Sequence, residues 1–162
     1  MILIALGANL PSPAGPPAET LNAALRKLPG RGITIVKRSG FYRSAAWPDP
    51  RDPAFVNGVA EVATMLSPAA LLNALHAVET EFGRNRGAPN APRTLDLDLL
   101  DYDERVEEGP PQLPHPRMET RAFVLIPLRD VAPDWRHPVS GRPLSELIAA
   151  LPPSGIEMIS PS

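Results

Sequence analysis

The chain contains no cysteine and no long apolar run. Without a thiol it can form neither a disulfide framework nor a cysteine-ligated zinc site, and thiolate chemistry is excluded. The first apolar run, at residues 2–6, is far too short to cross a membrane, and no basic leader precedes it. We therefore expect a cytoplasmic protein that is not associated with a membrane.

Three common catalytic motifs are also missing. The single glycine of Gly7-Ala8-Asn9 is not followed by the Gly-Lys-Ser/Thr of a P-loop. The sequence has no Gly-x-Ser-x-Gly nucleophile elbow and no His-Glu-x-x-His zinc motif. P-loop nucleotidases, α/β-hydrolases and metalloproteases of that type are thereby excluded.

The bulk composition is that of an ordinary globular protein. Its 162 residues suffice for one domain with a buried core, and 43% of them are hydrophobic. A formal net charge of −2 argues against a nucleic-acid-binding surface. No internal repeat and no linker between two cores is visible. The sequence predicts a single domain over residues 1–162, and a monomer is the simplest expectation.

Hydrophobic spacing predicts alternating strands and helices before residue 103. Strands are expected at residues 2–6, 33–42, 54–64 and 93–102, and helices at residues 21–28 and 67–82. Ser67 and Pro68 supply an N-cap hydroxyl and a proline at the first helical position, and Gly83 ends that helix.

This βαββαβ order is that of an α+β, ferredoxin-like split βαβ sandwich. The remaining residues are expected to form a C-terminal elaboration of the same domain. We expect a short helix or strand at residues 121–130, a helix at 144–151 and a loose end at 152–162.

The most informative segment is PRTLDLDLL, residues 92–100. As a β-strand it places Leu95, Leu97 and Leu99 on one face. Asp96 and Asp98 then lie on the other face, about 6.6 Å apart. Mg²⁺ is usually held by one or two carboxylates while phosphate oxygens and water fill its other positions, so this pair is suited to it. An ordinary half-exposed strand shows the same alternation, which leaves both interpretations open.

Basic residues flank this strand on both sides: Arg84, Arg86, Arg93, His115 (between two prolines), Arg117 and Arg121. Any one of these arginines alone would be interpreted as a solvated surface residue. Several of them beside an Asp-x-Asp strand indicate a polyphosphate site, where cations and Mg²⁺ share the charge. His76 lies three residues before Glu79 on the expected second helix, and a solvated helical histidine explains that pair equally well.

The sequence resembles the family of 6-hydroxymethyl-7,8-dihydropterin pyrophosphokinases, enzymes of folate biosynthesis. The resemblance covers nearly the whole chain and is carried mainly by PRTLDLDLL, by LPHPRM at residues 113–118 and by RAFVLIPL at 121–128. Two positions differ from the family pattern. PNAPR at residues 89–93 stands where members commonly have Arg-Trp-Gly-Pro-Arg, and Pro110 stands near the place of a further arginine.

This resemblance implies transfer of the β,γ-diphosphate of ATP to the hydroxymethyl oxygen of the reduced pterin, with release of AMP. Asp96 and Asp98 would hold two Mg²⁺ ions, and Arg84 and Arg93 would be catalytic. The implied ATP-binding residues are His76, Arg86, Leu99, Gln112, His115, Pro116 and Arg121. The implied pterin-binding residues are Ser44, Ala45, Trp47, Phe55, Asn57 and Phe123.

Two other functions remain open at this point. A nucleotidyltransferase also uses a carboxylate pair with two Mg²⁺ ions, although the Gly-Ser turn that usually holds the triphosphate is missing here. A ferredoxin-like binding module without catalysis would keep the same fold, and the altered loop at residues 89–93 is the one feature that favours it.

Overall fold

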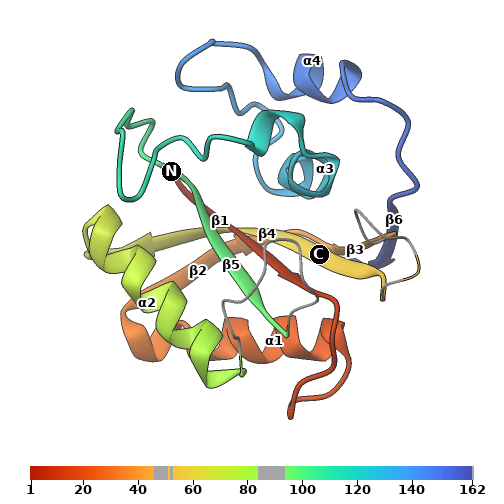
Figure 1. Ribbon diagram of the computed structural model, residues 1–162. Helices are drawn as coiled ribbons and strands as arrows, with labels where there is room; N and C mark the ends of the chain where they lie inside the picture. Colours follow the sequence, from red (N-terminus) through yellow and green to blue (C-terminus); the bar gives the residue numbers. More distant parts are fainter. Residues whose placement is uncertain (46–50, 52, 84–93, 162) are drawn as a thin grey trace.

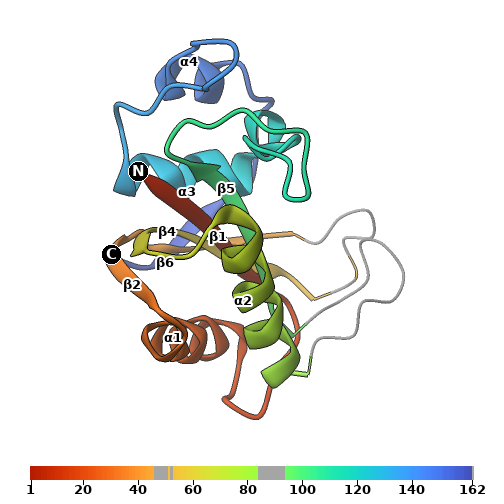
Figure 2. The ribbon, with the colours of Figure 1, turned by 90° about the vertical axis from the view of Figure 1, so that its left-hand side faces the viewer.

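A single antiparallel sheet lies between two helical layers in the computed structural model, which describes residues 1–45, 51, 53–83 and 94–161. Helices α1 (Pro17–Lys27) and α2 (Pro68–Glu81) cover one face (Figure 1). Helix α3 (Ala122–Val131) covers the other face, and α4 (Leu144–Ala149) lies outside it (Figure 2). Within the described ranges, no helix has the length and apolarity needed to span a membrane.

The centre of the sheet places residues from distant parts of the chain in one row. Strands β5 (Asp96–Tyr102), β1 (Ile2–Ala8) and β4 (Phe55–Thr64) are neighbours in that order, and both pairings are antiparallel. Gly7 of β1 lies opposite Asn57 of β4 and opposite Asp96 of β5. Since directly opposed residues share a face of a sheet, these three point to the same side.

The strand expected at residues 33–42 is in fact two strands. β2 (Ile33–Arg38) pairs with the C-terminal half of β4, and β3 (Phe41–Ser44) pairs with its N-terminal end. Between them Ser39 donates its backbone N–H to the Val59 carbonyl at 2.8 Å, and its hydroxyl accepts the Val59 N–H at 2.9 Å. A side-chain oxygen thus takes the place of a backbone carbonyl, which interrupts the regular ladder.

The prediction of a loose end at residues 152–162 is wrong for residues 157–160. There β6 (Glu157–Ser160) pairs antiparallel with β3 and extends the sheet. Met158 and Ile159 remain exposed, so the strand is held by its backbone and by no buried side-chain pattern. Hydrophobic periodicity could not have revealed it.

Helix α2 forms where local chemistry predicted it, whereas α1 begins at Pro17, four residues before the predicted start. The Ser67 hydroxyl accepts the Ala70 N–H at 3.2 Å at the start of α2, and Gly83 follows its end with φ of +80°. Leu71, Leu75 and Val78 of α2 are fully buried against the sheet. Leu95, Leu97 and Leu99 belong to the same core, as the alternation in the motif predicted.

A second core lies on the opposite face of the sheet, beneath α3. It joins Leu3, Val59 and Leu100 of the sheet to Leu125 of α3 and to Trp135. Leu100 is an extra residue in β5, because Leu3 lies opposite Asp101 and Ile4 opposite Leu99. By the alternation of the strand, Leu100 faces α3 as Asp96 and Asp98 do, so β5 contributes to both cores. The β-bulge brings the next residue, Asp101, to this same face, opposite Leu3. The segment at residues 121–130, expected to be a helix or a strand, is therefore a helix that covers this face.

Candidate active site

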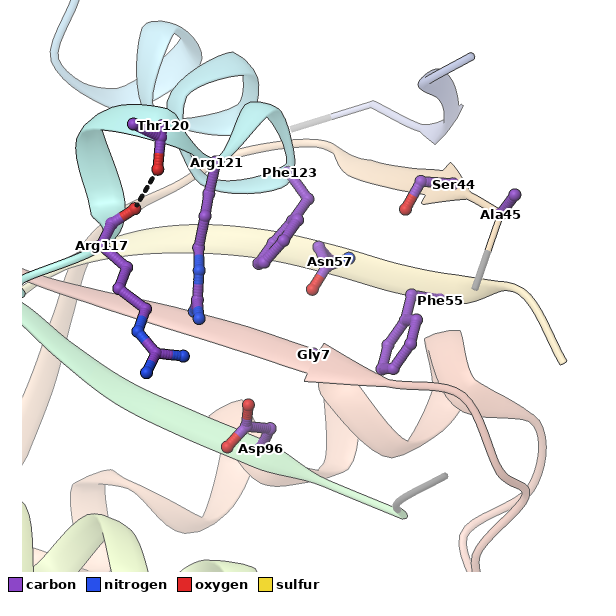
Figure 3. Close-up of a pocket in the computed structure, with 10 residues that line it drawn as sticks. All are labelled: Gly7, Ser44, Ala45, Phe55, Asn57, Asp96, Arg117, Thr120, Arg121 and Phe123. Atoms are coloured by element: carbon purple, nitrogen blue, oxygen red, sulfur yellow. Dashed lines mark hydrogen bonds between the residues drawn. The ribbon is translucent and has the colours of Figure 1, made fainter. Parts of the chain in front are cut away.

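A pocket of about 500 Å³ lies over the α3 side of the sheet, where β1 and β3 end and β4 and β5 begin. This volume falls within the range of about 300–1,000 Å³ that is usual for small-molecule sites. Its lining residues, drawn in Figure 3, are Gly7, Ser44, Ala45, Phe55, Asn57, Asp96, Arg117, Thr120, Arg121 and Phe123. They come from four strands, from Ala45 just after β3, from the segment that leads into α3 and from the first turn of α3.

The pocket has a charged end and an aromatic end. At the charged end, the guanidinium groups of Arg117 and Arg121 extend from the α3 side toward Asp96 on β5 (Figure 3). At the aromatic end, the rings of Phe55 and Phe123 lie on either side of the Asn57 side chain (Figure 3). A ligand that filled the pocket would therefore meet charges at one end and flat apolar surfaces at the other.

Asp96 and Asp98 point to the α3 side of β5, opposite the buried leucines, and both are half-buried. Asp96 lines the pocket, whereas Asp98 lies one step further along the strand, opposite Ala5. Within the described ranges, no group of three or more His, Asp or Glu side chains could hold a metal ion by itself. Two carboxylates nevertheless suit Mg²⁺, whose remaining ligands are commonly water and substrate phosphates.

The two arginines of the charged end are held by a short 3₁₀ turn (Met118–Thr120). The Thr120 hydroxyl donates to the Arg117 carbonyl at 3.2 Å, which closes the turn (Figure 3). The Arg121 guanidinium carbon lies 5.4 Å from the centre of the Phe123 ring, a distance typical of a cation–π contact. Arg121 therefore connects the two ends of the pocket.

His115 is held beside the charged end as a neutral imidazole. Its backbone N–H donates to the Leu100 carbonyl at 2.8 Å, and its Nδ1 accepts the Arg117 N–H at 3.2 Å. Burial lowers the pKa of His115 to about 4, helped by the positive charge of Arg121 and opposed by Asp96. At neutral pH the ring proton consequently sits on Nε2, where it can be donated to a ligand.

The aromatic end depends on a glycine. A Cβ atom at Gly7 would lie 2.5 Å from Oδ1 of Asn57, which is too close for any side chain at that position. The absence of a side chain at Gly7 thus lets the Asn57 amide lie across β1. The Asn57 residue is 7% exposed, and its amide has no hydrogen bond to a described residue that would compete with a ligand.

The structure brings about half of the expected site residues together. Those that line the pocket are Ser44, Ala45, Phe55, Asn57, Asp96, Arg121 and Phe123. Those that lie outside its lining are His76, Asp98, Leu99, Gln112, His115 and Pro116. The Leu99 side chain is buried in the core on the other face of the sheet, and His76 lies on α2, which covers that other face. Trp47, Arg84, Arg86, Arg93 and the altered loop at 89–93 lie outside the described residues.

Two residues line the pocket without an expected role, Gly7 and Thr120, whereas Arg117 was expected only as one of several basic residues beside the motif strand. Thr120 lies in the same segment as His115, Arg117 and Arg121, so its nearness to those residues was the available signal. Gly7 could not be found from local pattern, because its importance depends on the register of β1 against β4.

The fold and the site define the class: a mixed helix-and-sheet protein with an antiparallel sheet and a small-molecule pocket that has one charged and one aromatic end. The family model of 7,8-dihydro-6-hydroxymethylpterin-pyrophosphokinase (HPPK) matches residues 3–133. The chain belongs to this family.

Curated relatives agree with this assignment. A 2-amino-4-hydroxy-6-hydroxymethyldihydropteridine pyrophosphokinase of Pseudomonas aeruginosa is 45% identical over 162 residues, which is 98% of this chain and 96% of that protein. The protein of the same name from Synechocystis sp. is 38% identical over 161 residues, 98% of this chain and 80% of that protein.

Solved structures show the same fold at low sequence identity. A Plasmodium falciparum HPPK-DHPS variant, crystallised with pterin and p-hydroxybenzoate, superposes with a TM-score of 0.70 at 12% identity. The similarity covers 91% of this chain but only 43% of that one, so the present chain corresponds to less than half of the HPPK-DHPS protein.

Proposed function

We propose that this chain transfers the diphosphate of ATP to the hydroxymethyl group of 6-hydroxymethyl-7,8-dihydropterin, giving the pterin diphosphate and AMP, a step of folate biosynthesis. Membership of the HPPK family and the names of relatives that match nearly the whole chain support this activity. The observation that carries it is a pocket in which a carboxylate and two arginines lie together with a pair of phenylalanine rings.

The aromatic end suits the pterin. Phe55 and Phe123 offer flat faces for a heteroaromatic ring, and such stacking is favourable. The Asn57 amide both donates and accepts hydrogen bonds, as the amino-pyrimidinone edge of a pterin requires. Ser44 and Ala45 close this end of the pocket. Trp47, which lies outside the described residues, is also part of the proposed pterin-binding surface.

The charged end suits the phosphates. Asp96 and Asp98 would hold Mg²⁺, in the proposed two-ion arrangement, which supplies charge neutralisation and orientation of the triphosphate when bound. Arg121 and Arg117 would bind phosphate oxygens, and the neutral His115 would donate its Nε2 proton to another. The proposal also includes three arginines outside the described residues. Arg84 and Arg93 would be catalytic cations, and Arg86 would contact ATP.

The reaction needs positioning more than a strong base. The hydroxymethyl oxygen attacks the β-phosphorus and releases its proton to water. The bond from that phosphorus to the oxygen bridging the α-phosphate breaks, and AMP leaves with that oxygen. Such transfers depend on in-line placement and on neutralising the negative charge of the phosphates. The pocket supports such placement, because its aromatic and charged ends belong to one cavity.

The adenine site and the finer fold assignment belong to the same proposal. His76, Leu99, Gln112 and Pro116 would surround the nucleotide through side chains or backbone.

The strand order β5-β1-β4-β2 supports a ferredoxin-like split βαβ fold. In this order β1 lies between β5 and β4, and β4 lies between β1 and β2. A single-domain, monomeric, cytoplasmic protein remains our prediction.

One assay tests the activity against its alternatives. The purified protein is incubated with Mg²⁺, ATP and 6-hydroxymethyl-7,8-dihydropterin, and the nucleotides and pterins are separated by chromatography. We expect AMP and the pterin diphosphate in equal amounts. A product that carries AMP on the pterin would indicate a nucleotidyltransferase, and tight pterin binding without turnover would indicate a binding module.

A further inference from the structure

Glu79 is a buried carboxylate for which the proposed reaction has no use. It lies near the C-terminal end of α2 and is 1% exposed. Its Oε2 accepts the backbone N–H of Leu97 at 2.8 Å. Leu97 is the residue between Asp96 and Asp98, so the hydrogen bond acts on the backbone that carries both carboxylates.

The position of β5 explains why this contact matters. β5 ends the sheet on its side, and only β1 pairs with it among the described strands. Successive residues of a paired strand direct their N–H groups alternately toward and away from the neighbour. The Leu97 N–H that reaches Glu79 is therefore directed away from β1, at the outer edge of the sheet that the described strands form.

The three residues of the Asp-Leu-Asp segment are consequently held from two sides. Asp96 and Asp98 lie opposite Gly7 and Ala5 of β1, and Leu97 is held by Glu79 from α2. Helix α2 is itself fixed by Leu75 and Val78, which are fully buried in the core. A charged acceptor makes a stronger hydrogen bond to a backbone N–H than a neutral one does.

We propose that Glu79 is a positioning residue that sets the backbone of β5 so that Asp96 and Asp98 present their carboxylates together to Mg²⁺. This inference rests on the proposed function of the aspartate pair. Groups that orient metal ligands in this way typically affect metal affinity or activity by about 10–100-fold.

Three variants separate positioning from general stability. Glu79→Met removes the acceptor at nearly constant length, Glu79→Asp keeps the charge but withdraws it by one methylene, and Glu79→Gln keeps an acceptor oxygen. Leu75→Ala is the matched control, because it creates a cavity beneath the same helix without touching the Leu97 N–H.

The first readout needs neither substrate nor metal. In the metal-free protein, hydrogen exchange of the Leu97 amide, followed by NMR, should become at least about tenfold faster in Glu79→Met and in Glu79→Asp, and should stay slow in Glu79→Gln. Leu75→Ala should change exchange at Leu97 no more than at other residues of the core.

The second readout is the Mg²⁺ concentration that gives half-maximal activity. We expect it to rise about 10–100-fold in Glu79→Met and Glu79→Asp and to return close to the wild-type value in Glu79→Gln. Leu75→Ala should lower the melting temperature with an unchanged Mg²⁺ requirement. Two outcomes would overturn the proposal. One is a folded Glu79→Asp variant with the wild-type Mg²⁺ requirement, and the other is a Glu79→Gln variant whose Mg²⁺ requirement is raised as much as that of Glu79→Met.

The two proposals can fail separately. If the wild-type protein forms no pterin diphosphate, the proposed function fails, and Mg²⁺ binding is then measured directly by calorimetry on the same variants. If the wild-type protein is active and these variants bind Mg²⁺ as it does, only the role of Glu79 is refuted.

Discussion

Single residues determine what the two ends of the pocket can bind. Gly7 has no side chain, and this absence creates the space in which the Asn57 amide lies. His115 is half-buried between an N–H donor and positive charges, so it is a neutral donor and adds no positive charge to the site. Each effect belongs to one residue, and each can be tested by one change.

Replacing Gly7 by alanine should impair pterin binding selectively. The new Cβ would lie 2.5 Å from Asn57 Oδ1, so the amide must rotate and lose its alignment with the pterin edge. The loss of one or two hydrogen bonds predicts a KM for the pterin about tenfold higher, with little change in the KM for ATP. Gly30→Ala, where no atom lies within 4 Å of the new Cβ, is the control for a glycine change as such. Equal effects on both substrates would contradict this account.

The His115 ring should stay neutral far below the ordinary pKa of 6.5. Because its folded pKa is about 4, the unfolded chain takes up the proton first as the pH falls. The resulting stability is fully present above pH 6.5 and is lost as the pH falls toward 4. NMR of the ring protons, assigned with His115→Gln, should show no titration between pH 8 and pH 5.5. A midpoint near 6.5 would show that burial does not control this ring.

At the scale of elements, local chemistry and long-range pairing contribute differently. Helix α2 is determined by nearby residues, with the Ser67 cap and Pro68 at its start and Gly83 after its end. The break between β2 and β3 depends on Val59, twenty residues along the chain from Ser39. Strand β6 depends on the free edge of β3. For this reason α2 was predictable from the sequence, whereas the break and β6 were not.

Strand β6 should support the pterin end of the pocket. It pairs with β3, whose last residue, Ser44, lines the pocket together with Ala45. Removal of residues 155–162 should lower the melting temperature and raise the KM for the pterin a few fold, because β3 would lose one of its two neighbours. Thermal melts and steady-state kinetics measure both effects.

The matched variant for this truncation is Glu157→Gln. It removes only the exposed ion pair with Arg43, at 3.6 Å, and surface pairs of this kind contribute about 0–1 kcal/mol. An unchanged KM for the pterin in the truncated protein would show that β4 alone holds β3 in place.

At the scale of the whole molecule, the sheet connects two cores. The core under α1 and α2 holds the leucines of β5, and the core under α3 holds Leu100 of the same strand. Asp101 joins β5 to the second core, since its carboxylate accepts the Trp135 Nε1–H at 2.9 Å and the Glu104 N–H at 3.0 Å. Burial raises the pKa of Asp101, and the Trp135 hydrogen bond opposes that rise.

Replacing Trp135 by phenylalanine should therefore destabilise the protein in a pH-dependent way. With a folded pKa above the ordinary value, stability falls as the pH rises and the buried carboxylate becomes charged. Without the indole donor this fall should become steeper, with an extra loss of about 1–3 kcal/mol at pH 7.5 compared with pH 3.5. Urea unfolding at the two pH values measures the difference. An equal loss at both would indicate that only packing was lost.

The sequence by itself determined the local features: the alternation of Leu95, Leu97 and Leu99 with Asp96 and Asp98, the limits of α2, and the resemblance that led to the family. These follow from the two-residue period of a strand and from capping groups a few residues apart. Only the tertiary structure decided which distant residues lie together. Asp96, Gly7 and Asn57 share one row of the sheet. Arg117 and Arg121 face that row, and Glu79 accepts the Leu97 N–H. These contacts join strands and helices distant in the chain, and their register is set by packing on both faces of the sheet, which no short stretch of sequence encodes.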